Sequence, residues 1–165
     1  MLSCALMLGA SAAQAHSVSF SIGQTSESTA VYRVATQFNF GTKWLESDTG
    51  HLTGYWDAGY TYWIGDDTAS NNSISLSPVF TYVFNSSGGI TPYIEAGIGG
   101  ALFSSTELET NDLSTSFLFE DRIGVGIRFA KVHDVALRII HYSNGGIKEP
   151  NDGVENFGIN YRYSF

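Results

Sequence analysis

The sequence predicts an all-β protein, an eight-stranded antiparallel transmembrane β-barrel. Apolar and polar residues alternate with a period of two over successive segments, as in strands that have one apolar and one polar face. Aromatic residues make up 14% of the chain and cluster within single segments, as in the interfacial girdles of membrane barrels. The chain also opens with residues typical of an export signal. A length of 165 residues suits one domain.

The first fifteen residues are expected to be a signal peptide. Leu2 to Ala12 is a run of apolar and small residues, and Ala13-Gln14-Ala15 matches a small-x-small cleavage site, although no Lys or Arg precedes the run. Cys4 is the only cysteine, and almost no apolar segment precedes it, so a lipoprotein signal is the weaker interpretation. Cleavage after Ala15 would leave residues 16–165 as a barrel domain without disulfides.

The charge of the chain restricts its partners. The formal net charge is -8 at pH 7, and no cluster of Lys or Arg is present. This balance argues against nucleic acid as a partner and against recruitment by anionic headgroups. Any contact with a membrane is therefore expected to be made by apolar surface.

Alternation predicts eight strands, separated by turn-rich segments such as 86–89 and 145–153. It is clear in the segment 116–129, where Phe117 and Ile123 share one face and Glu120 and Arg122 the other. The eight predicted strands are 16–24, 29–40, 51–64, 72–84, 90–104, 114–129, 134–144 and 154–165.

Most of the basic charge is predicted to point into the barrel. A barrel of about eight strands is too narrow for a water channel, so inward charges should pair in a packed polar core. Four glycines on the inward faces, Gly97, Gly99, Gly124 and Gly126, are expected to make room for long side chains. The inward charged residues are Arg33, Arg122, Arg128, Arg138 and Arg162, with Asp57, Glu95 and Glu120.

A soluble β-sandwich is the alternative fold, because its strands also alternate. In a sandwich the apolar face would be the inside. The export signal, the terminal Phe165 and a cluster of aromatic residues in the third strand favour the membrane barrel. That cluster consists of Tyr55, Trp56, Tyr60, Tyr62 and Trp63.

Three chemically active residues lie on the apolar face of the last two predicted strands. His141 and Ser143 are in phase with Leu137 and Ile139, and Glu155 is in phase with Phe157. Polar groups on the lipid face are costly, so their presence calls for an explanation. Together they supply the base, the nucleophile and the orienting acid of an acyl-transfer site. A β-bulge between residues 135 and 143 would reverse this assignment.

The spacing leaves parts of the site open. His-x-Ser is a short and common pattern, and Asp121, also on the apolar face of its strand, competes with Glu155 as the acid. An oxyanion would need donors. The nearest candidates are the Asn144 side chain and a backbone N–H at Gly145-Gly146, with Asn151 more distant.

Topology predicts where the site lies in the membrane. Both termini of such barrels normally lie in the periplasm, so the connection between the last two strands faces outward. The main lipid of that outer leaflet is lipopolysaccharide, which has ester bonds at its sugar–acyl boundary. The site is therefore expected to meet esters.

The segment from His141 to Glu155 resembles the signature of the lipid A 3-O-deacylases, and 92–99 and 119–124 resemble the family less specifically. The likeness spans nearly all of residues 16–165. It implies an enzyme of the bacterial outer membrane that hydrolyses the ester-linked 3-hydroxyacyl chain at the 3 position of lipid A, with no metal or organic cofactor. It further implies a triad of His141, Ser143 and Glu155, which favours Glu155 over Asp121, and oxyanion donors at Asn144 and the backbone of Gly146.

Two other functions remain as alternatives. A non-enzymatic adhesin or structural barrel needs only alternation, but it leaves the polar groups on the lipid face unexplained. A phospholipid esterase would keep the chemistry and change the substrate. Lys148 is expected to be a solvated loop lysine. The alternative interpretation is that it contacts lipid A phosphates. Nothing in the sequence specifies an oligomeric state.

Overall fold

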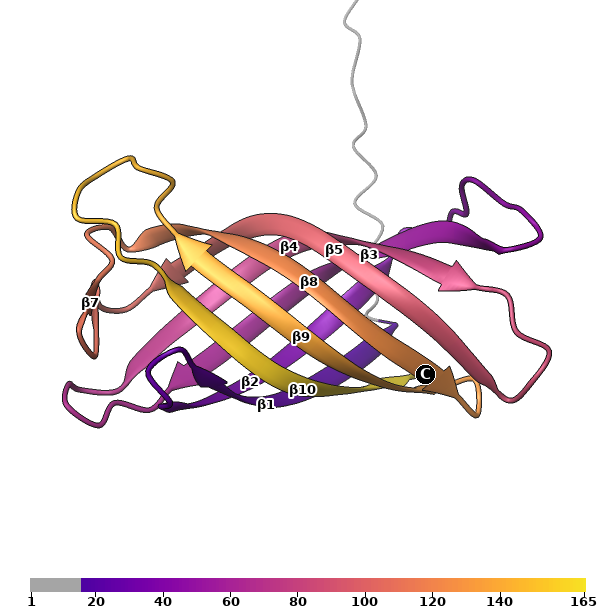
Figure 1. Cartoon of the computed structure of the whole chain (residues 1–165), viewed down its shortest axis with the longest axis horizontal. Helices are drawn as coiled ribbons and strands as arrows, with labels where there is room; N and C mark the ends of the chain where they lie inside the picture. The colour runs from indigo at the N-terminus through magenta and orange to yellow at the C-terminus, as the bar shows by residue number, and fades with distance from the viewer. Residues whose placement is uncertain (1–15) are drawn as a thin grey trace, which may run out of the picture.

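A computed structural model describes residues 16–165, which form a closed barrel of eight antiparallel strands (Figure 1). The predicted barrel is confirmed, and each predicted strand overlaps one observed strand. The predicted signal peptide, with Cys4, lies outside the described residues. In order around the barrel the strands are β1 (Ser17–Thr25), β10 (Val154–Ser164), β9 (His133–Ser143), β8 (Phe117–Phe129), β5 (Ile90–Phe103), β4 (Asn71–Phe84), β3 (Gly50–Trp63) and β2 (Ala30–Asn39).

One element was not predicted. The connection between β5 and β8 contains a small hairpin of β6 (Glu107–Leu108) and β7 (Asn111–Asp112), which pair with each other. Residues 16–165 contain no helix that is long and apolar enough to cross a membrane.

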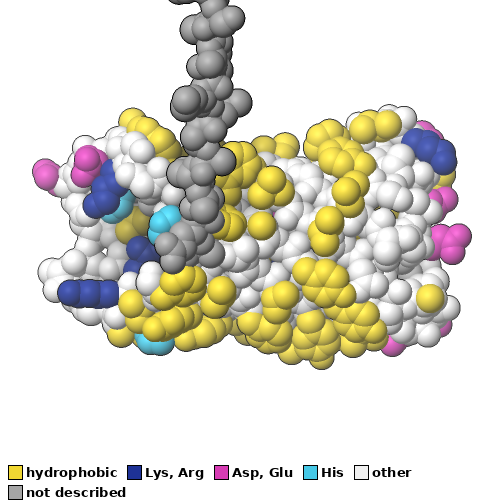
Figure 2. All heavy atoms as spheres, turned by 180° about the vertical axis from the view of Figure 1, so that it is seen from behind, with side chains coloured by type: hydrophobic (Ala, Val, Ile, Leu, Met, Phe, Trp, Pro, Cys, Tyr) yellow, Lys and Arg dark blue, Asp and Glu magenta, His cyan; other side chains and the backbone are white. Residues whose placement is uncertain are grey.

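The outer wall of the barrel is apolar around its whole circumference. Each strand places large apolar side chains outside, such as Val34, Leu76, Ile98 and Leu137, which are 51 to 60% exposed. In Figure 2, from the side opposite to Figure 1, such side chains cover the wall while charged ones gather at the two ends. Closure leaves no unpaired strand edge, as a sheet surrounded by hydrocarbon requires.

The aromatic cluster of β3 is divided between the two faces of the sheet. Trp56, Tyr60 and Tyr62 are exposed on the wall, as predicted. Tyr55 and Trp63 are instead buried inside the barrel, with exposures of 3% and 0%. Their assignment to the girdle was wrong because the strict period of two turns odd-numbered residues of this strand inward.

The two ends of the barrel differ, and the strands are inclined between them (Figure 1). The termini end carries His16, Phe165 and the turns that follow β2, β4 and β8; the loop end carries the connections that follow β1, β3, β5 and β9. The register shows the direction of this inclination. Followed from strand to strand around the barrel, the residues paired with Ser143, at the loop end of β9, lead back to His133, at the termini end of the same strand. A step from β9 toward β8 and β5 is therefore also a step toward the termini end. The paired residues in between are Phe119, Gly100, Leu76, Ala58, Thr36, Val18 and Tyr163.

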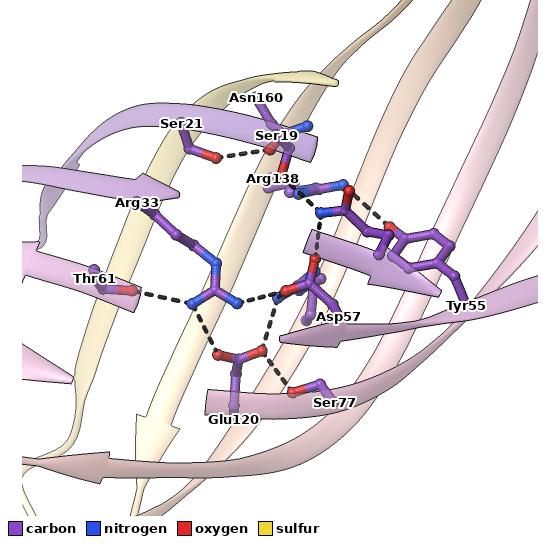
Figure 3. A network of polar contacts seen from close by, with 12 residues as sticks. Ser19, Ser21, Arg33, Tyr55, Asp57, Thr61, Ser77, Glu120, Arg138 and Asn160 are labelled. Carbon is purple, nitrogen blue, oxygen red and sulfur yellow. Dashed lines mark hydrogen bonds and ion pairs between the residues drawn. The ribbon is translucent and has the colours of Figure 1, made fainter. Parts of the chain in front are cut away.

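Inside the barrel, charged side chains pair as predicted (Figure 3). Asp57 accepts hydrogen bonds from Arg33 and, at 2.9 Å, from Arg122. Arg122 also donates to Glu120 at 2.8 Å. All four residues are at most 2% exposed and come from β2, β3 and β8. The pair of Arg122 with Asp57 therefore connects β8 and β3, which are not neighbours in the sheet.

A second set of pairs lies nearer the termini end. Arg138 donates to Glu95, and Arg162 donates to Asp134 at 2.8 Å. Arg128 completes this set with a 3.2 Å bond to Asp134, although its side chain is 36% exposed. Asp134 was not predicted to be part of the core.

Two of the four inward glycines make room for long side chains. A Cβ on Gly126 would lie 2.6 Å from the Tyr93 ring, and one on Gly124 would lie 3.0 Å from the Glu95 side chain. Gly97 and Gly99 differ, because each lies against strand β4 rather than a long side chain: a Cβ there would meet the Pro78 carbonyl oxygen or the Ser77 hydroxyl.

The loop end of the interior is closed by apolar side chains. The unpredicted β6–β7 segment contributes Leu108 and Leu113, both at most 1% exposed. They pack with Trp63, Phe103 and Tyr142 in one buried cluster. An apolar layer thus covers the polar core at the loop end, next to the connection between β9 and β10.

Replacing Asp57 with alanine should destabilise the barrel by about 3–5 kcal/mol, since two buried arginines, Arg33 and Arg122, would share one carboxylate, that of Glu120, in place of two. The matched control is Asp48→Ala, which removes an exposed carboxylate from the β2–β3 turn and should change stability by no more than about 0.5 kcal/mol. The measurement is the free energy of unfolding in urea, with the protein refolded into lipid vesicles. Equal effects of the two changes would contradict the pairing described.

Candidate active site

The site is centred on two residues that face each other across the β9–β10 ladder. His141 and Glu155 are directly paired in register. The His141 Nδ1 lies 2.9 Å from Glu155 Oε1, so an Nδ1–H tautomer donates to the carboxylate. Their side chains are 40% and 37% exposed on the outer wall. This bond leaves the Nε2 nitrogen of the imidazole as the group that can accept a proton.

Ser143 lies two residues beyond His141 on the same face of β9 and is half-buried. The register of β9 runs without a shift from His133 to Tyr142 against β10, and to Ser143 against β8. The strand therefore contains no bulge, and the predicted placement of His141 and Ser143 on one outer face is confirmed. A hydroxyl, an imidazole and a carboxylate share the wall at the loop end.

Asp121 flanks His141 on the other side. It is the partner of His141 in the β8–β9 ladder and is exposed on the same wall. His141 thus stands between two acids, one on each neighbouring strand. The hydrogen bond of the imidazole goes to Glu155. This bond favours Glu155 over Asp121, and the role of Glu155 as the acid stays a prediction.

An apolar groove of about 560 Å³ begins at Asp121 and His141. It continues over β8 and β5 to Phe80 on β4, with Ile98 and Ile139 among its walls. Each step from β9 toward β8, β5 and β4 is also a step toward the termini end. The groove therefore runs from His141 toward that end. A larger groove, about 770 Å³, lies beside it around Leu137 and Ile159 and includes none of the three site residues.

The β9–β10 connection is organised by Asn144. This residue is fully buried and points inward, as alternation predicts. Its amide donates to the carbonyl oxygens of Leu113 at 3.1 Å and Lys148 at 2.7 Å, and its Oδ1 accepts from the Gly146 backbone at 2.9 Å. Asn151 adds a 2.9 Å bond through its Oδ1 to the Asn144 N–H. One side chain therefore holds two points of the β9–β10 connection, Gly146 and Lys148, and ties it to Leu113 of the β5–β8 connection.

These bonds bear on the predicted oxyanion donors. The amide of Asn144 already donates to Leu113 and Lys148, and the Gly146 N–H already donates to Asn144. Their role toward an oxyanion stays a prediction.

Positive φ angles of +65°, +79° and +68° at Gly145, Gly146 and Gly153 explain why glycine stands at each of these bends. A Cβ on Gly153 would lie 3.0 Å from the His141 Cε1 atom, so this glycine also admits the imidazole.

Some supporting residues were not predicted. The carbonyl of Leu113 accepts from Asn144, and that of Ser114 accepts from Lys148 at 3.3 Å. Both lie just after β7, a segment without alternation or a motif. Within residues 16–165 no group of three or more His, Cys, Asp or Glu side chains is placed to hold a metal ion.

Comparison with known proteins identifies the family. The family model described as lipid A 3-O-deacylase (PagL) matches residues 30–164. The chain belongs to this family. It is 48% identical over 151 residues to a lipid A deacylase PagL of Pseudomonas aeruginosa, covering 91% of this chain and 87% of the relative. It is 36% identical over 129 residues to one of Bordetella bronchiseptica, covering 76% and 67%.

A solved structure agrees with this membership. The crystal structure of the outer membrane enzyme PagL superimposes with a TM-score of 0.87 at 47% identity, covering 90% of this chain and 99% of that one. The crystal structure of Neisserial surface protein A, at 14% identity and a TM-score of 0.52, shares the fold, covering 90% and 94%. Family membership and the closed barrel make this chain an outer-membrane protein.

Asn144→Ala should loosen the β9–β10 connection, since three bonds to one buried side chain are lost. Lysyl endopeptidase should then cut after Lys148 about tenfold faster or more in the folded barrel, because cleavage follows the population of the opened loop. Cleavage after Lys131, in the β8–β9 turn at the other end, is the internal control and should not change. Fragment masses over time give both rates. An unchanged rate at Lys148 would contradict the anchoring role.

Proposed function

We propose that this protein hydrolyses the ester-linked 3-hydroxyacyl chain at the 3 position of lipid A. Ser143 is the nucleophile, His141 the general base and Glu155 the acid that orients the imidazole. The observation that carries the proposal is the 2.9 Å bond between His141 and Glu155 on the exposed wall of a member of the lipid A 3-O-deacylase family. A structural barrel has no need of this polar pair on a costly lipid face.

The reaction follows from these roles. His141 takes the proton of Ser143 as its oxygen attacks the ester carbonyl, and the imidazolium is stabilised by Glu155. Collapse of the tetrahedral intermediate breaks the bond to the sugar oxygen, which receives the proton from His141. Water, activated by His141 in turn, then releases the 3-hydroxy fatty acid and restores Ser143. Every proton and bond is accounted for by this chain, its substrate and water, so we propose no cofactor.

The groove below His141 suits the acyl chain. It starts beside the base, is walled by apolar residues such as Ile98, Ile123 and Ile139, and runs along the barrel wall toward the termini end. A chain lying there stays within the hydrocarbon layer. The substrate would need only to slide along the wall, with its ester at Ser143, and a deep pocket is unnecessary.

The site is proposed to face the outer leaflet. Outer-membrane barrels have short periplasmic turns and longer external connections. The longest connection, 104–116, lies at the loop end with the site, as does 144–153. At the termini end 40–49 is as long as 144–153, but 85–89 and 130–132 are short, so the loop end carries more connecting residues in total. Lipopolysaccharide fills that leaflet, and its sugar–acyl boundary lies at the depth where polar groups on a barrel wall cost least.

Asn144 and Gly146 remain the proposed oxyanion donors. Because their hydrogens already donate to Leu113, Lys148 and Asn144, a donor role requires exchange of one of these bonds. The bond from Asn144 to Lys148 is an example, and the arriving oxyanion would replace it. Charge-assisted bonds are stronger than those to a neutral carbonyl, which favours such an exchange.

Ser143→Ala should lower the rate of lipid A deacylation by about 10³-fold or more while the barrel stays folded. The measurement is mass spectrometry of lipid A after incubation with the refolded protein, where the wild type removes one 3-hydroxyacyl mass. A parallel incubation with phospholipid vesicles separates the two ester substrates. Full activity of the variant would exclude Ser143 as the nucleophile, and products from phospholipid alone would exclude lipid A as the substrate.

The two acids beside His141 allow a matched comparison. Glu155→Gln should reduce kcat by about 10²–10⁴-fold, since the imidazole loses the carboxylate that fixes its tautomer. Asp121→Asn removes the same charge from the opposite side and should have the smaller effect on kcat. Initial rates on lipid A, at several substrate concentrations, measure both. A larger loss of kcat in Asp121→Asn would reassign the acid.

A further inference from the structure

Tyr142 lies between His141, the proposed base, and Ser143, the proposed nucleophile, in the sequence. Its side chain points into the barrel, whereas theirs lie on the outer wall. It is fully buried in the interior at the loop end. Its hydroxyl donates to Glu120 Oε2 at 2.9 Å. Its ring packs edge-on against Trp63 and Phe103, with centroids 5.3 and 5.4 Å away.

We propose that Tyr142, through its hydrogen bond to Glu120, is a positioning residue that sets the geometry of His141 and Ser143 on the outer wall. The inference rests on the proposed function of those two residues. It adds to that function an inner anchor, which touches neither substrate nor reacting atoms.

The pairing of β9 explains why an anchor is needed at this residue. Tyr142 is the last residue of β9 that pairs with β10, where its partner is Val154. Ser143, the next residue, is paired only with Phe119 of β8. The backbone that carries the nucleophile is therefore held on one side only, immediately beyond Tyr142. Any rotation of the strand end at Tyr142 moves Ser143 relative to His141.

The anchor lies directly behind the site. Glu120 is the cross-strand partner of Tyr142 in the β8–β9 ladder, and its neighbours Phe119 and Asp121 are the partners of Ser143 and His141. A bond between Glu120 and Tyr142 on the inside thus fixes the same stretch of ladder that carries the site on the outside.

Glu120 is itself held firmly. Its Oε1 accepts from Ser77 of β4 at 2.7 Å and from Arg122 at 2.8 Å, and Arg33 of β2 lies 3.6 Å from its Oε2 (Figure 3). The carboxylate cannot follow a moving tyrosine without breaking bonds to other strands. The hydroxyl of Tyr142 therefore links the end of β9 to the rigid polar core, and ring packing alone would leave the ring free to shift along its apolar neighbours.

The barrel contains a matched control. Tyr55 of β3 makes the same kind of buried bond, from its hydroxyl to Glu95 Oε2 at 2.7 Å. Neither Tyr55 nor Glu95 lies on β8, β9 or β10. Tyr55→Phe therefore removes an equivalent bond from the interior. It also removes a 3.1 Å bond that the Tyr55 hydroxyl accepts from Arg138 of β9. Because Arg138 lies four residues before Tyr142, nearer the termini end, this variant reports on loss of interior bonds away from the site.

The test compares Tyr142→Phe and Tyr55→Phe with the wild type and Ser143→Ala on lipid A, with kcat and KM expressed per folded barrel. We expect Tyr142→Phe to lower kcat by about tenfold or more with KM unchanged, because a misplacement of reacting groups by about 1 Å can cost about 10²-fold in rate. Tyr55→Phe should leave both constants near the wild type. Urea unfolding of both variants shows whether their losses of stability are alike.

The outcomes separate this inference from the proposed function. An inactive wild type, or an active Ser143→Ala variant, would overturn the proposed function itself. If those two behave as expected, then an unchanged kcat in Tyr142→Phe overturns the positioning role alone. An equal fall of kcat in Tyr55→Phe also overturns it, since the effect would then reflect general softening of the interior.

Discussion

The structure depends on one constraint, that a sheet surrounded by hydrocarbon must satisfy all its backbone hydrogen bonds within itself. Eight antiparallel strands meet it by closing into a barrel with β10 paired to β1. Once the register is closed, the period of two fixes the face of every residue. The same rule that turns Arg33 and Asp57 inward turns His141 and Glu155 outward. Core and site are therefore two consequences of one ladder.

The narrow interior determines how charge is handled inside. A lone buried charge is strongly unfavourable, so each guanidinium lies against a carboxylate. Asp57 is bonded by arginines from β2 and β8, and Glu120 by groups from β4, β8 and β9. The contacts of Arg122 with Asp57 and of Ser77 with Glu120 cross the barrel, whereas those of Arg33 with Asp57 and of Tyr142 with Glu120 join neighbouring strands. The crossing contacts restrain strands that backbone hydrogen bonds do not join directly. The bond from Tyr142 to Glu120 connects β9, the strand of the proposed site, to this network.

The sequence predicts faces well because alternation is local. The strand ranges, the inward charges and the outward placement of His141, Ser143 and Glu155 all follow from it. Which charges pair does not, because Arg33 and Glu120 meet only after closure brings β2 and β8 to opposite sides of a narrow core. Asp134 was missed because it stands second in its strand, where alternation has barely begun. The β6–β7 hairpin was missed because so short a pair carries no period.

The choice between Glu155 and Asp121 shows a different limit of local reasoning. Both are partners of His141 in the sheet, one on each side, so spacing gives them equal standing. Only the orientation of the imidazole distinguishes them, and that depends on side-chain geometry. Asn144 is similar: alternation turns it inward, but its bonds to Leu113, Gly146 and Lys148 depend on how the β5–β8 and β9–β10 connections come to lie together.

The proposed site lies on the outside of the barrel and has no second layer of protein behind its substrate. Its side chains must therefore be positioned from the interior of the barrel. Along β9, outward His141 and Ser143 alternate with inward Tyr142 and Asn144, and both inward residues are fully buried and hydrogen-bonded. Each outward group thus has a fixed inward neighbour. In a soluble hydrolase the walls of a pocket hold the catalytic side chains in place. Here that role falls to the polar core, the apolar layer above it and the β5–β8 connection. The lipid-facing side is left open, and a substrate that already lies in the bilayer can approach it along the wall.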